Sequence, residues 1–134
     1  VYGNALYRDY VRLYVPVNSE LQAQTGWQWR GASNRFGHTQ WAGFFTLLFG
    51  QTRTISLTWT VPHSATYHNH GWDYHYLIQK QAGAAWLLHL NMALPTCATQ
   101  AGISGWKMSP SRQAATLETY LYEDTNLDAH YVCR

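Results

Sequence analysis

Four histidines are concentrated in one short segment of this 134-residue chain. His68 and His70 are separated by one residue, so a strand here would place both imidazoles on the same side. Imidazole nitrogens bind zinc and copper, and the segment therefore offers a metal site on His63, His68, His70 and His75. The alternative is a solvated loop, because residues 64–71 have the composition of a turn. No cysteine, glutamate or second paired motif accompanies these histidines, so we expect no cofactor and keep the metal site as an alternative.

Motifs for catalysis are missing from the sequence. A glycosidase needs two carboxylates that face each other across a cleft, whereas the seven acidic residues are scattered along this chain. The chain has no Gly-x-Ser-x-Gly nucleophile motif and no glycine-rich phosphate loop that leads into a helix. We therefore expect that the protein is not an enzyme.

Three tryptophans directly follow a glycine, each where a loop is expected to begin or end: Trp27, Trp72 and Trp106. Exposed tryptophan and tyrosine rings stack on sugars and anchor protein interfaces, so these three residues are candidates for a glycan-binding surface. The alternative is that each ring covers one end of the fold, and that the preceding glycine makes room for it.

A second candidate surface lies near the N-terminus, where arginine and tyrosine alternate. Tyr10, Arg12 and Tyr14 occupy every second position and would share one face of a strand. Such a face can stack on sugars or bases. The alternatives are cross-strand pairing of arginine with tyrosine, or burial against another domain.

Apolar residues with a period of two identify the elements that position these side chains. The clearest run is 53–61, in which Ile55, Leu57 and Trp59 alternate with threonine and serine. Segments 7–15 and 85–94 show the same alternation, and the second of them places Trp86 on its apolar face. In 41–48 both faces are apolar, which predicts a central strand that is covered on both sides. Weaker strands are expected at 21–25, 38–49, 73–80, 115–122 and 127–133.

No segment sustains the period of a helix, so the sequence predicts an all-β fold. Strands at this spacing, separated by turn residues, are typical of an antiparallel immunoglobulin-like β-sandwich. We expect seven to nine strands, little or no helix, and a single domain that spans 1–134. Gly50 and Gln51 are expected to form a hairpin turn, and 96–112 a polar loop.

The chain is rich in aromatic residues (16%) and poor in charged ones (12%), where about 25% charged residues is usual. Ample apolar surface excludes a disordered chain. A net charge of +2 is too small for the basic stripe of a nucleic-acid-binding protein. Apolar runs are too short to span a bilayer, so we expect no membrane insertion of this segment.

Cys97 and Cys133 have the spacing of neither a zinc site nor a redox motif. A disulfide between them would tie the C-terminal tail to the body of the domain. It would close a loop of roughly 36 residues, worth about 3–4 kcal/mol. Two buried thiols are the alternative. The disulfide is favoured because low charge is typical of extracellular proteins, in which disulfides persist.

Four strings together carry a family resemblance: Tyr10–Pro16 (YVRLYVP), Gly50–Leu57 (GQTRTISL), Trp59–Pro62 (WTVP) and Tyr76–Gly83 (YLIQKQAG). In order and spacing they resemble the C-terminal β-domain of bacterial cell-surface proteins, known as domain of unknown function 4012. The resemblance covers about 7–95. It implies a secreted or membrane-anchored parent protein, of which this chain, beginning at Val1, would be a fragment or processed product. It supplies no catalytic residues.

The expected function is a non-enzymatic structural or adhesion module, located outside the cell or on its surface. Long strands with few charges leave sheet edges poorly protected, so assembly into an oligomer or fibre is plausible. The expected partners are other copies of the chain, other surface proteins and glycans, but not nucleic acid. The first alternative is a carbohydrate-binding module that uses the loop tryptophans, and the second is a metal-binding protein.

Overall fold

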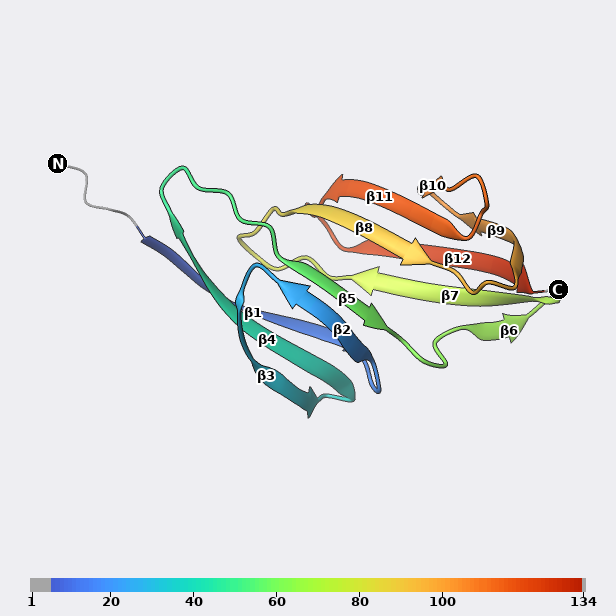
Figure 1. The fold of residues 1–134 in the computed structure, drawn as a ribbon, viewed down its shortest axis with the longest axis horizontal. Coiled ribbons are helices and arrows are strands. Elements are labelled where there is room, and N and C mark those ends of the chain that lie inside the picture. The colour runs from blue at the N-terminus through green and yellow to red at the C-terminus, as the bar shows by residue number, and fades with distance from the viewer. Residues whose placement is uncertain (1–5, 134) are drawn as a thin grey trace. The chain divides into compact units, whose positions relative to one another are not determined.

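Twelve strands and no helix make up the part of the chain that the computed structural model describes, residues 6–133 (Figure 1). Every strand pairing is antiparallel, which confirms the all-β antiparallel class. No helix capable of crossing a membrane is found in this described part. The strands are β1 (Leu6–Pro16), β2 (Glu20–Thr25), β3 (Gln28–Arg35), β4 (His38–Leu48), β5 (Ser56–Thr60), β6 (Thr66–His68), β7 (Gly71–Ile78), β8 (Leu87–Ala93), β9 (Ala98–Ile103), β10 (Lys107–Met108), β11 (Ala114–Tyr120) and β12 (Thr125–Cys133).

The chain divides into two compact units, Val1–Ser64 and Ala65–Arg134. Each unit contains two antiparallel sheets that contribute side chains to a shared apolar core, an arrangement consistent with a β-sandwich. A single domain spanning 1–134 and an immunoglobulin-like strand order both stay predictions.

In the first unit, β4 lies between β1 and β3, and β2 pairs with β5 (Figure 1). The central place of β4 confirms one part of the expectation. Only one of its faces, with Trp41 and Phe45, packs in the core cluster, so the expected covering of both faces is not found in the described part of the chain. Alternation decides which side chains point inward. Residues of β1 and β4 meet Leu21 of β2 and Leu57 and Trp59 of β5 in one cluster. The buried members of this cluster are Val15, Trp27, Trp41 and Phe45.

Trp27, directly before β3, fits this core because the residue of β4 beneath its ring is a glycine. Its indole ring lies directly over Gly43, where a Cβ atom would overlap the ring. The indole Nε1 donates a hydrogen bond to Oε1 of Gln24 at 2.7 Å, so the buried ring keeps a polar partner. The missing side chain of Gly43 thus makes room for the tryptophan that closes the core.

The second unit contains the sheet β6-β7-β12-β9 and the sheet β10-β11-β8. Its buried hydrophobic residues are mostly alanine, joined by Ile103 of β9 and by Leu127 and Tyr131 of β12. Because alanine fills little volume, larger and partly buried side chains complete the packing. Those that pack against the cluster of Ile103, Ala115 and Ala129 are Tyr74, Met92, Trp106 and Met108.

The structure has more strands than the seven to nine expected, because four lie in segments without period-two patterning. β3 contains Gly31, Ser33 and Asn34, residues typical of turns, and is a strand because it pairs with β4. β9 and β10 lie within the expected polar loop 96–112, and β6 within the segment rich in histidine and asparagine.

The expected hairpin at Gly50–Gln51 is also wrong. Gln51 N–H donates to the Leu48 carbonyl at 3.0 Å, so a turn is present. However, β5 pairs with β2 rather than with β4, so the turn joins two sheets.

We predict that Gly43→Ala destabilises the first unit by about 2–3 kcal/mol, because the new methyl group collides with the buried Trp27 ring. Urea unfolding followed by tryptophan fluorescence measures the change. The control is Gly102→Ala, since Gly102 has open space around its Cβ position. Equal stability of the Gly43→Ala variant and the wild type would show that Trp27 does not lie over β4.

Candidate functional site

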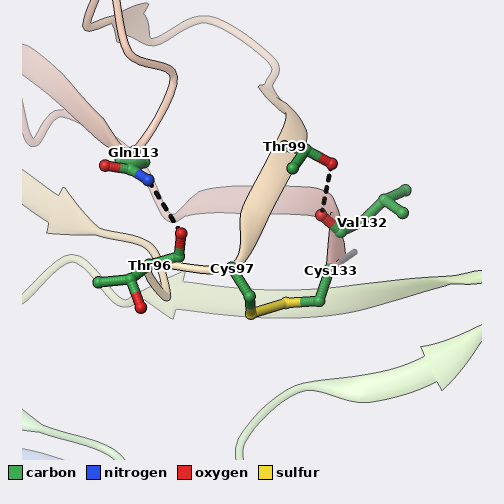
Figure 2. Close-up of a disulfide and its surroundings, with 6 residues drawn as sticks. All are labelled: Thr96, Cys97, Thr99, Gln113, Val132 and Cys133. Atoms are coloured by element: carbon green, nitrogen blue, oxygen red, sulfur yellow. Dashed lines mark hydrogen bonds between the residues drawn. A yellow bond between two sulfur atoms is a disulfide. The ribbon is translucent and has the colours of Figure 1, made fainter.

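A disulfide joins Cys97, immediately before β9, to Cys133, at the end of β12 (Figure 2). The two Cα atoms are 4.8 Å apart, because β9 and β12 are paired neighbours at this point. Thr99 Oγ1 donates to the Val132 carbonyl at 3.3 Å beside the bridge. The expected disulfide is confirmed. It holds the last strand against β9 and constrains the unfolded chain.

The four histidines of the alternative metal site are not brought together. His68 lies in β6 and His75 in β7, whereas His63 and His70 lie between strands with positive φ angles of 55° and 63°. These left-handed residues turn the chain, so the period-two spacing of His68 and His70 does not continue along one strand. Within residues 6–133, no group of three or more His, Cys, Asp or Glu is placed to hold a metal ion.

Histidines instead face carboxylates directly across paired strands. His75 Nδ1 lies 2.5 Å from Asp128 Oδ1, and His130 Nδ1 lies 2.7 Å from Asp73 Oδ1, both between β7 and β12. On the other sheet, His89 of β8 pairs with Glu118 of β11 at 2.9 Å. The sequence alone does not reveal these pairs, because only the strand register brings residues so distant along the chain together. Polar contacts between facing side chains stabilise the pairing of the two strands.

Asp73 contacts two histidines, whereas each of the other two carboxylates contacts one. Its second oxygen lies 3.7 Å from His68 Nδ1, so histidines of β6 and β12 flank it. The hydrogen bond from His130, followed by the charges of neighbouring histidines, lowers the pKa of Asp73 below 3.8. The His130 ring lies over Gly71, which has no side chain to displace it. These groups are largely exposed, and their geometry serves strand pairing.

The three loop tryptophans occupy three different environments. Trp27 is only 8% exposed, so its expected role in ligand contact is wrong: the ring belongs to the core. Trp106 is half-buried against the core of the second unit, and its Nε1 is buried without a hydrogen-bond partner. Trp72 is 36% exposed and makes an edge contact with the exposed Tyr67, with ring centroids 5.4 Å apart. Of the three, Trp72 remains accessible to a ligand.

The alternating arginine and tyrosine residues of β1 lie as expected on its outer face. Tyr10 and Tyr14 are exposed, whereas Leu13 and Val15 on the other face pack in the core. The Arg12 guanidinium lies 5.0 Å from the centre of the Tyr10 ring. Interaction between these two side chains therefore holds part of the face in place.

Comparison of the chain with protein-family models, curated proteins and solved structures finds no match. The resemblance to the β-domain of bacterial surface proteins therefore stays a prediction.

We predict that His130→Ala raises the pKa of Asp73 toward 3.8, because it removes the hydrogen bond that favours the carboxylate. A pH titration of carboxyl carbon shifts by NMR measures this. With a folded-state pKa below the unfolded value, the stabilisation is complete at pH values above 3.8 and is lost as pH falls through the folded pKa.

The control is His89→Ala, which removes a histidine paired with Glu118 in the other sheet and leaves Asp73 untouched. An unchanged Asp73 titration in His130→Ala would contradict the pairing of β7 with β12 in this register.

Proposed function

We propose that this chain is a non-enzymatic structural or adhesion module of an extracellular surface, which associates with other copies of itself. The disulfide supports the setting, because such bonds persist in oxidising compartments. The low content of charged residues agrees with a surface that is partly covered when the protein works. The sequence resemblance to β-domains of bacterial surface proteins favours the same setting.

The observation that carries self-association is the exposure of large apolar side chains. Phe49, directly after β4, is 93% exposed. Tyr120 and Tyr122 are exposed and stack with ring centroids 5.6 Å apart. Aromatic rings displayed in this way are the residues that most often anchor contacts between proteins.

Strand β8 offers a second element for assembly. It forms an edge of the sheet β10-β11-β8 and contains no Lys, Arg, Asp, Glu or Pro. Edge strands of natural monomers usually carry such residues to discourage pairing with another chain. An edge without them favours assembly through backbone hydrogen bonds.

Sedimentation velocity over a wide range of protein concentration tests this function. We expect concentration-dependent oligomers for the wild type. The double variant Phe49→Ser and Tyr122→Ser should weaken association about tenfold or more, because it removes two aromatic anchors. The control exchanges two exposed polar residues outside β8, Gln81→Ser and Asn126→Ser, and should associate like the wild type. A wild-type chain that stays monomeric at every concentration would contradict the proposal.

A further inference from the structure

One face of the first unit combines arginines with aromatic rings. The ladder register places alternate residues of β1 and β4 on the same side: Tyr10 faces Phe44, and Phe44 in turn faces Gln28 of β3. The opposite side of these strands carries the core residues Trp41 and Phe45. We call the outer side the cationic aromatic face, and its members are Arg8, Tyr10, Arg12, Tyr14, Arg30, Arg35 and Phe44.

Positive charge gathers on this face although the whole chain is nearly neutral. Residues 1–64 contain five arginines and two acidic residues, and four of the five arginines belong to the face. The two acids lie elsewhere. Asp9 faces the core residue Phe45 across the ladder, and Glu20 is on β2. Among residues 6–133, every ion pair has a histidine as its basic partner, so these arginines have no carboxylate partner in the described structure.

The aromatic rings hold two guanidinium groups in place. The guanidinium carbon of Arg12 lies 5.0 Å from the centre of the Tyr10 ring. That of Arg30 lies 5.7 Å from the centre of the Phe44 ring. Tyr10 and Phe44 face each other in the ladder of β1 and β4. A guanidinium stacked on a ring keeps its N–H donors at the edge, where they can bind an oxyanion with two parallel hydrogen bonds. The face therefore displays ordered anion-binding groups rather than mobile charges.

Spacing along β1 suits a polymer with repeated anionic groups. Residues two apart on one face of a strand are about 7 Å apart, which puts Arg8 and Arg12 about 13 Å apart. Two residues beyond Arg12 on the same face lies Tyr14, whose exposed ring offers a surface on which a sugar can stack. Arginines and a tyrosine in this order match a chain that carries both charged groups and apolar sugar faces.

We propose that the cationic aromatic face binds an anionic polysaccharide, through its sulfate or carboxylate groups and its sugar rings. The inference rests on the proposed extracellular setting for the choice between a glycan and a nucleic acid as the ligand. Single-stranded nucleic acid shares the chemistry of stacking and anion binding, and the oxidising setting that the disulfide supports favours a glycan.

The test uses the full chain and dextran sulfate as the probe, with uncharged dextran as the reference polymer. We expect dextran sulfate to bind and dextran not to bind. Arg12→Gln with Arg30→Gln should weaken binding about tenfold or more. The slope of log Kd against log salt should fall by about two, because two fewer counterions are released.

The matched control is Lys80→Gln with Lys107→Gln, which removes the same charge from the second unit. Its affinity should stay close to that of the wild type. Far-UV circular dichroism checks that both double variants are folded. Equal weakening by both double variants would overturn the proposal, because it would show a general effect of net charge.

Two further outcomes would overturn the inference: failure of the wild type to bind dextran sulfate, and preferential binding of oligothymidylate in competition. Each is independent of the association measured by sedimentation. A monomeric chain that binds dextran sulfate through Arg12 and Arg30 would support this inference while contradicting self-association.

Discussion

The register of the antiparallel ladders is the constraint on which the rest of the structure depends. In β1, alternation sends Leu13 and Val15 into the core and leaves Tyr10 and Arg12 on the outer face. A slip of one residue against β4 would exchange these two sets and expose the apolar residues. The fit of Trp27, directly before β3, over Gly43 opposes a slip of β3 against β4, because a position on β4 with a side chain could not accept the ring. The strand register in the first unit therefore determines both which side chains pack in the core and which lie on the outer face.

The second unit is fixed in register by polar and covalent contacts. Four of the residues in its buried clusters are alanines, so burial of each of these contributes little free energy. The contact between facing residues such as His75 and Asp128 forms in only one register of β7 and β12, and it stabilises that register. The Cys97–Cys133 disulfide marks the register of β12 and β9 at the other end of the same strand. Several of the few acidic residues in this chain therefore lie at facing strand positions, where their contacts with histidines stabilise the register.

The parts of the fold that sequence predicted are those in which burial alone decides conformation. β1, β5 and β8 are half-buried, so their period of two is visible in the residues themselves. β3 was missed because its strand conformation comes from pairing with β4, not from its own glycine, serine and asparagine. Trp27 was misplaced for a related reason: its burial depends on Gly43, which is distant in the sequence. The outward position of Tyr10, Arg12 and Tyr14 was predictable, whereas the gathering of arginines from β3 beside them required the register.

Hydroxyl-radical footprinting by mass spectrometry tests the central claim most directly, because it reports which side chains each ladder exposes. Each rate is compared with that of the same residue in the urea-unfolded chain. The register of β1 and β4 predicts that Tyr10 and Tyr14 keep a much larger share of their unfolded-chain rates than Trp27 and Trp41, which are strongly protected. Protection of both tyrosines together with rapid oxidation of Trp41 would contradict the register, and with it the position of the cationic aromatic face.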